Sequence, residues 1–184
     1  SKKVVGVSLP GCFAEYVKVP HRNAVALPPS LPYSRAALGE PVAVALHVIH
    51  QAHVEFWQRV AVFGAGMLGL IVVQLLKQSG ADVVVVDRFR SKLKIAEELG
   101  ADRTYDVATT RWEAIDPDAA YDCVIDAAGV EETLRQSLRV AGRGGRIVWM
   151  GMPSLEIGVE IFPLVYREAS IVTSIAYTPC EFVD

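Results

Sequence analysis

The chain has 184 residues, 52% of them hydrophobic, and a net charge of −3. This length allows one domain with a buried core, or one domain with part of another, and the composition is that of a folded globular protein. The acidic balance excludes the clustered basic surface that nucleic acid requires, and no apolar segment is long enough to span a bilayer. We therefore expect neither a nucleic-acid nor a membrane partner. The three cysteines form no CxxC pair, which favours a reducing, cytoplasmic compartment.

Residues 1–36 are rich in proline and carry one segment, 13–19, in which apolar and polar residues partly alternate. That alternation predicts a short edge strand. The double proline at 28–29 cannot lie inside a helix or a central strand. We interpret this stretch as an edge piece and a linker, not as an independent domain.

From Tyr33 onward the pattern becomes regular. Ser34 predicts the cap of a helix that runs to about Gln51. Apolar strands are predicted at 60–63, 83–86, 103–105, 123–125, 146–150 and 171–175, with helices at 67–78, 91–99 and 131–140. Such alternation predicts an α/β fold, a doubly wound parallel (Rossmann) sheet of about six strands, spanning residues 37–184. No helix is predicted after the sixth strand, so we expect a truncated C-terminus.

The segment Gly64-Ala65-Gly66-Met67-Leu68-Gly69 fits the pattern G-x-G-x-x-G. The pattern alone also fits a plain strand-to-helix turn, but here a predicted strand precedes it and a helix follows. The first glycine allows the tight turn, the second lets a pyrophosphate approach the backbone, and the third lets the helix pack closely. The sequence therefore predicts a dinucleotide-binding loop.

Asp87 ends the next predicted strand, where a carboxylate accepts hydrogen bonds from the adenosine ribose. It would also repel a 2′-phosphate, which favours NAD over NADP. Arg88, Arg90 and Lys92 crowd the same loop and could offset that repulsion, so NADP is the alternative. In a purely structural interpretation, Asp87 caps a loop and the basic residues form a solvated helix start.

Six segments of the chain form a joint pattern: GCFAEYV at 11–17, EPVAVALH at 40–47, VFGAGMLGL at 62–70, LGAD at 99–102, DAAG at 126–129 and GGRIV at 144–148. In these segments the chain resembles the medium-chain, zinc-dependent alcohol and polyol dehydrogenases, above all the sorbitol and threonine dehydrogenase branch. The segments follow the order found in the family, and the joint pattern is more specific than any one motif. The resemblance implies that residues 1–36 are a remnant of a β-rich catalytic domain.

The resemblance also implies site residues. The cofactor positions are Gly64, Gly66, Met67, Leu68, Gly69, Asp87, Arg88, Lys92, Ala128, Gly129, Met150 and Gly151. Glu40 matches the position that points a carboxylate at the catalytic zinc. The complete protein would then use NAD and zinc to transfer hydride from a small alcohol or polyol, and would form a homo-oligomer through a region near 151–175.

Departures from the family pattern leave other functions open. The other zinc ligands, a cysteine and a His-Glu pair, are not in this sequence, so we expect the chain alone to be inactive. Ala176 stands where the polyol branch often has arginine, which argues against a polyol. The alternatives are a zinc-free quinone or enoyl reductase and a non-catalytic NAD-sensing module.

Other candidates have plainer interpretations beside the functional one. His47, His50 and His53 recur every three residues and could bind a metal, or they could line a polar helix edge with no carboxylate partner. Glu40 near a helix start is favourable with the helix dipole in any case.

Two carboxylates and a cysteine share the fourth predicted strand. Asp122 and Asp126 could act as paired acids, but a cap or turn role is the stronger hypothesis. Cys123 lies within the apolar run and is predicted to be an inert core residue.

Overall fold

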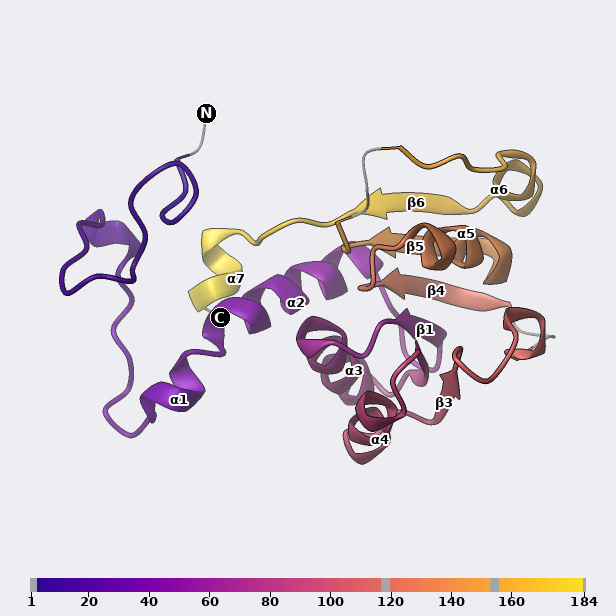
Figure 1. Ribbon diagram of the computed structural model, residues 1–184, viewed down its shortest axis with the longest axis horizontal. Coiled ribbons are helices and arrows are strands. Elements are labelled where there is room, and N and C mark those ends of the chain that lie inside the picture. The colour runs from indigo at the N-terminus through magenta and orange to yellow at the C-terminus, as the bar shows by residue number, and fades with distance from the viewer. Residues whose placement is uncertain (1–2, 117–119, 153–155, 184) are drawn as a thin grey trace.

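A six-stranded, all-parallel sheet forms the centre of the structure, a computed structural model that describes residues 3–116, 120–152 and 156–183 (Figure 1). The strands lie in the order β3-β2-β1-β4-β5-β6. They are β1 (Arg59–Phe63), β2 (Asp82–Asp87), β3 (Arg103–Asp106), β4 (Tyr121–Asp126), β5 (Ala141–Trp149) and β6 (Ser170–Thr173). The order runs outward in both directions from the β1–β4 pair, which confirms the predicted doubly wound α/β fold.

Helices cover both faces of the sheet. One face is packed by α2 (Gly39–Ala52), α3 (Met67–Gln78) and α4 (Arg90–Glu98). The opposite face is packed by α5 (Glu131–Val140), α6 (Phe162–Arg167) and the segment around the 3-10 turn η2 (Trp112–Ala114). Successive strand residues point to opposite faces, so a strand covered on both sides must be apolar throughout.

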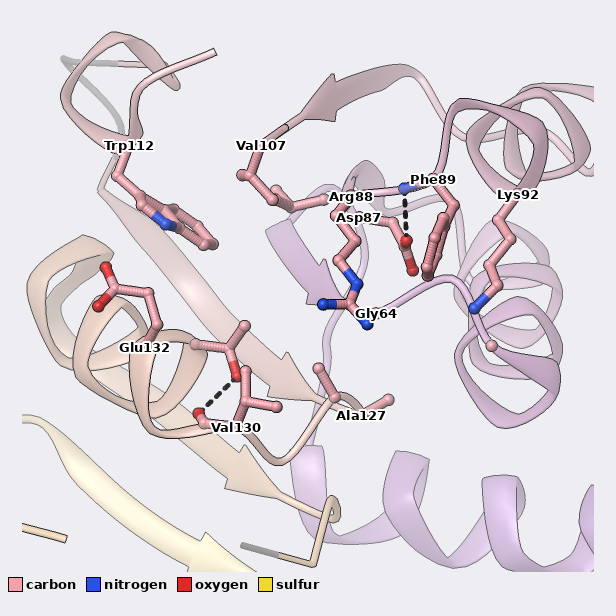
Figure 2. Close-up of a pocket in the computed structure, with 14 residues that line it drawn as sticks. Gly64, Asp87, Arg88, Phe89, Lys92, Val107, Trp112, Ala127, Val130 and Glu132 are labelled. Carbon is pink, nitrogen blue, oxygen red and sulfur yellow. Dashed lines mark hydrogen bonds between the residues drawn. The ribbon is translucent and has the colours of Figure 1, made fainter. Parts of the chain in front are cut away.

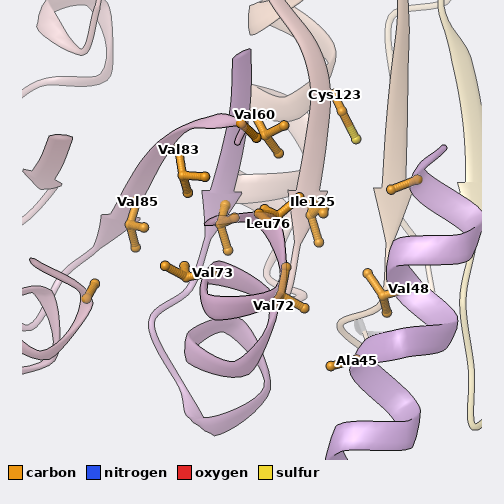
Figure 3. Close-up of a cluster of buried hydrophobic side chains, with 14 of the residues drawn as sticks. Ala45, Val48, Val60, Val72, Val73, Leu76, Val83, Val85, Cys123 and Ile125 are labelled. Carbon is orange, nitrogen blue, oxygen red and sulfur yellow. The ribbon is translucent and has the colours of Figure 1, made fainter. Parts of the chain in front are cut away.

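Strand β1 shows this alternation directly. Val60 and Val62 enter the cluster beneath α2 and α3, whereas Ala61 and Phe63 enter the cluster on the α5 side. Figure 3 shows the first cluster, where Val72 and Leu76 of α3 lie against the strands. Burying each valine or leucine side chain stabilises the fold by about 1.5–3 kcal/mol. The apolar strands therefore hold their carboxyl ends, where the glycine loop begins, in fixed positions.

The helix predicted from Ser34 to about Gln51 is in fact two helices. Short α1 (Tyr33–Ala36) is capped by Pro32, with Ser34 inside it, and α2 starts afresh at Gly39. Pro41 explains the restart, because proline has no N–H to donate and is tolerated only in the first turn of a helix. The prediction of one helix capped by Ser34 is wrong.

The N-terminal stretch lacks the predicted strand at 13–19. The backbone there forms bends and irregular structure, and the described part of this stretch holds one isolated bridge, between Val5 and Leu9. Nearly all of its side chains are exposed, Phe13 and Tyr16 among them. Alternation alone does not make a strand without a neighbouring strand to share its hydrogen bonds.

The C-terminal part contains two helices that the sequence did not predict. Strand β6 ends at Thr173, and a short helix, α7 (Pro179–Val183), follows and packs on α2 (Figure 1). The expectation that no helix follows the sixth strand is therefore wrong. Both α6 and α7 carry a proline near their first residue, and they are too short for a periodic apolar pattern. Within the described residues, no helix is long and apolar enough to cross a membrane.

Candidate functional site

A cavity of about 430 Å³ opens where β1, β2 and β4 end (Figure 2). Backbone and side chains of three loops line it, together with η2. The lining residues are Gly64, Gly66, Val86, Asp87, Arg88, Phe89, Lys92, Val107, Trp112, Ala127, Ala128, Val130, Glu132 and Thr133. Carboxyl ends of parallel strands on either side of a reversal in strand order are where open α/β sheets bind ligands.

The glycine loop has the geometry that its sequence predicts. Gly64 has a φ of +100°, and an added Cβ would stand 2.9 Å from the Ala128 nitrogen, so a side chain is excluded. A Cβ on Gly69 would collide with the Gly64 carbonyl oxygen. A Cβ on Gly66, in contrast, would meet nothing within 4 Å. Two glycines are thus required by packing, whereas the space beside Gly66 is open.

That open space lies at the start of α3. Gly66 is the N-cap of the helix, and within the described part of the chain no side-chain cap accepts a hydrogen bond from the first backbone N–H groups. These N–H groups and the positive end of the helix dipole form a site for an anion. The loop can therefore receive a phosphate without any rearrangement of its own packing.

Asp87 is an acidic residue in direct contact with this loop. Its Oδ2 accepts a hydrogen bond of 2.7 Å from the Ala65 N–H, and its Oδ1 accepts one of 2.9 Å from the Phe89 N–H. The carboxylate therefore ties the glycine loop to the end of β2. Each carboxylate oxygen has more than one lone pair, so Asp87 can still accept a ligand hydroxyl. The capping role and the ribose-binding role are compatible.

Two cations beside Asp87 are held by an aromatic ring. The Arg88 guanidinium carbon lies 4.9 Å and the Lys92 Nζ 4.7 Å from the centre of the Phe89 ring. Such cation–π contacts restrain the two side chains at the cavity (Figure 2). Arg90 turns away and pairs with Glu97 at 2.9 Å.

The loop after β4 is organised by a buried carboxylate. Asp126 is fully buried, and its Oδ1 accepts hydrogen bonds from the Ala128 and Gly129 N–H groups at 2.8 and 2.9 Å. Burial raises the pKa of Asp126, against the opposing effect of these N–H donors. Asp122 is instead exposed, and its Oδ2 accepts from the Arg59 N–H at 2.8 Å. Asp126 therefore accepts hydrogen bonds within a turn, and Asp122 accepts one from the start of a neighbouring strand. These contacts agree with the cap or turn role that the sequence favours over a pair of acids.

The loops after β4 and β5 touch each other through glycines. A Cβ on Gly129, which has a φ of +64°, would stand 2.6 Å from the Gly151 carbonyl carbon, and one on Gly151 would overlap the Gly129 backbone. The N–H groups of Met150 and Gly151 both donate to the Asp126 carbonyl oxygen at 3.0 Å. These residues shape the edge of the site rather than the cavity wall.

The structure brings together half of the predicted cofactor residues in the cavity wall, namely Gly64, Gly66, Asp87, Arg88, Lys92 and Ala128. The other six do not line the cavity, and they are Met67, Leu68, Gly69, Gly129, Met150 and Gly151. Sequence reasoning missed Phe89, Trp112, Glu132 and Thr133. Phe89 lies just after the end of β2, and Glu132 and Thr133 lie in the first turn of the helix that follows β4. These positions were the available signal, but Trp112 had none.

Among the described residues, no group of three or more histidine, cysteine or acidic side chains has the arrangement that could hold a metal ion. Glu40 is exposed in the first turn of α2. His47 and His50 do have a carboxylate partner, contrary to expectation, since both Nδ1 atoms lie within 2.9 and 2.8 Å of Glu181 Oε1. His53 ends the helix with a φ of +49°. The described residues therefore do not complete a zinc site on their own.

The remaining candidate, Cys123, is buried in the core. Burial raises the pKa of its thiol to about 12, so the reactive thiolate is scarce at neutral pH. The burial confirms the predicted core position of Cys123, and the inertness of its thiol stays a prediction.

Known proteins share both the sequence and the fold. The family described as "Zinc-binding dehydrogenase" matches residues 68–184. The (R,R)-butanediol dehydrogenase of Bacillus subtilis is 34% identical over 91% of this chain and 49% of its own length. The chain thus spans about half the length of the curated relatives it matches.

Two solved structures superpose over nearly the whole chain. The short chain alcohol dehydrogenase of Escherichia coli, complexed with NADH, has a TM-score of 0.90 and 31% identity over 98% of this chain and 54% of its own. A zinc-binding dehydrogenase of Sinorhizobium meliloti, bound to NADP, has a TM-score of 0.90 and 34% identity over 97% of this chain and 55% of its own.

Proposed function

Because the chain belongs to the zinc-binding dehydrogenase family, we propose that it binds NAD in the cavity at the carboxyl ends of β1, β2 and β4. The observation that carries this proposal is the contrast within the glycine loop. Packing requires glycine at 64 and 69, but the space beside Gly66 is empty and adjoins unused helix N–H groups. A pyrophosphate would occupy that space.

Asp87 favours NAD over NADP. Its carboxylate is fixed by two backbone N–H groups at the cavity wall, so it can accept the ribose hydroxyls but cannot move away from a 2′-phosphate. Arg88 and Lys92 work in the opposite direction, because they place two positive charges at the same wall. Of the two solved structures named above, one contains NADH and the other NADP. We propose that the fixed carboxylate dominates.

The test is a fluorescence titration with NADH and NADPH of the wild-type chain and an Asp87→Ser variant. We expect the wild-type chain to bind NADH more tightly than NADPH. In the Asp87→Ser variant, the ratio of the NADPH Kd to the NADH Kd should be smaller. The matched control is Asp106→Ser, because Asp106 also ends a strand and accepts a backbone N–H at 2.8 Å, from Ala108, but does not line the cavity. Equal preferences in wild type and Asp87→Ser would refute the assignment of Asp87.

For the whole protein we propose reversible hydride transfer between a small alcohol or polyol and NAD. The sequence likeness to a butanediol dehydrogenase supports this. Bound nicotinamide would accept the hydride, while this chain supplies binding and orientation. We propose that Glu40 contributes to a zinc site whose other ligands lie outside the described residues. The check is NAD reduction by the full-length protein with short-chain diols, with and without a chelator.

Two alternatives predict different outcomes of that assay. A zinc-free quinone or enoyl reductase would retain activity after chelation and would reduce unsaturated carbonyl compounds. A non-catalytic sensor would bind NADH and turn over no substrate. The division at residues 36 and 37 is likewise a proposal, which limited proteolysis tests, since cleavage should fall first in the exposed N-terminal stretch.

We further propose that the protein acts in the cytoplasm as a homo-oligomer, joined through the surface formed by α6 and the edge strand β6. Phe162, Val165 and Tyr166 of α6 expose 77%, 68% and 75% of their surface. An edge strand beside such an apolar surface favours pairing with a second copy. Sedimentation of wild type and a Phe162→Glu variant tests this, with a smaller species expected for the variant.

A further inference from the structure

Trp112 occupies a wall of the cavity that the glycine loop does not reach. It comes from η2, in the connection between β3 and β4, and it lines the cavity together with Val107 (Figure 2). Nothing in the sequence pattern marks this connection as part of a site. The side chain is half-buried, so one part of the indole is held by protein and another faces the cavity.

The held part of the indole packs against the end of β1. The Trp112 and Phe63 ring centroids are 5.3 Å apart with an interplanar angle of 61°, an edge-to-face contact. Phe63 is 1% exposed and belongs to the core. Because its neighbour cannot move, the indole is held in one orientation before any ligand binds.

The cavity has one other aromatic wall, Phe89, and its ring already carries Arg88 and Lys92. The Trp112 and Phe63 rings meet at 61° and are therefore not stacked face against face, and Trp112 also lines the cavity. Figure 2 shows Trp112 on the side of the cavity opposite Arg88 and Phe89. A flat group entering between these walls would therefore meet the indole.

We propose that Trp112 forms the wall against which the adenine base of the cofactor packs. The inference rests on the proposed function and deepens it. In an adenosine diphosphate unit the ribose stands between phosphate and base. With the phosphate at Gly66 and the ribose hydroxyls at Asp87, the base enters the region lined by Val107, Trp112 and Val130. Stacking of a base on an aromatic side chain is general for purines and supplies affinity through the flat ring surface.

The experiment uses the full chain and ADP-ribose as the probe, titrated calorimetrically. Trp112→Leu keeps an apolar side chain but removes the aromatic surface, and it should weaken binding about 5- to 150-fold. Trp112→Phe keeps an aromatic ring and should stay within about 5-fold of wild type. A purely structural role predicts equal losses for both variants, and thermal unfolding of each identifies a folding defect.

A second readout is tryptophan fluorescence with AMP. Trp57 is 84% exposed and does not line the cavity, so Trp57→Phe is the matched control. AMP should quench the tryptophan emission of the Trp57→Phe variant strongly, because this variant retains Trp112. It should quench the tryptophan emission of the Trp112→Phe variant much less. If wild type, Trp112→Leu and Trp112→Phe all bind ADP-ribose with the same affinity, the proposal about Trp112 is wrong and the proposed function stands. If wild type binds no ADP-ribose, both are wrong.

Discussion

The sharpest consequence of the loop geometry concerns Gly66. Alanine at this position is expected to leave the fold intact and to remove most of the cofactor affinity. The backbone of Gly66 has φ −74° and ψ −177°, which an alanine adopts without strain, and the added Cβ meets no atom within 4 Å. The new methyl group would instead occupy the space proposed for the pyrophosphate.

The expected magnitudes follow from these contacts. Alanine is a poorer N-cap than glycine, which destabilises the fold, but it also lowers the entropy of the unfolded chain, which stabilises the fold. Each effect on the free energy of unfolding is about 1 kcal/mol or less, and the two effects oppose each other. The Tm should therefore change by less than about 4 °C. Loss of one hydrogen bond to a charged phosphate weakens binding by about 1.5–3 kcal/mol, or about 10- to 150-fold.

Gly69→Ala is the matched control, because its Cβ would collide with the Gly64 carbonyl oxygen. Overpacking of this kind destabilises by about 1–3 kcal/mol, so the Tm should fall by about 2–12 °C. The assay pairs thermal unfolding with NADH titration for both variants. A Gly66→Ala chain that unfolds like wild type and binds NADH with wild-type affinity would refute the placement of the pyrophosphate.

Two further predictions concern residues outside the loop. Cys123 should resist a thiol reagent at pH 7 in the folded chain while the exposed Cys12 and Cys180 react, because burial raises the Cys123 pKa to about 12; rapid labelling followed by mass spectrometry checks this. Burial alone would raise the pKa of Glu181, but the Thr178 N–H and the two histidines outweigh it and lower the pKa to about 2. Because this folded-state pKa lies below the ordinary value of 4.5, the stabilisation is complete above pH 4.5 and is lost as pH falls toward 2. Urea unfolding of wild type and Glu181→Gln should therefore differ above pH 4.5 and converge toward pH 2, and a difference that does not depend on pH would contradict the account.

The central part of the fold could be predicted because its signals are local. The valine run of β2, the helix 67–78 and the glycine loop between strand and helix each follow from residues close together in the chain. The family match confirms the resemblance to the zinc-dependent dehydrogenases that these motifs carry. The glycine loop and Asp87 were predicted as one site because parallel strands bring their carboxyl ends to the same edge of the sheet.

What escaped prediction depends on contacts between distant residues. Glu181 meets His47 across 134 positions, and no local pattern announces that pairing. Trp112 lies in an irregular segment and reaches the cavity only because the adjoining strands place it against Phe63. The strand predicted at 13–19 failed for the related reason that a strand requires a partner, which the sequence does not identify.

The most direct test of the account is a crystal structure of the chain with NAD bound. We expect a pyrophosphate beside Gly66 at the start of α3 and the adenosine ribose hydroxyls on the Asp87 carboxylate. A dinucleotide bound elsewhere, or a cavity at β1, β2 and β4 that stays empty at saturating NAD, would contradict it.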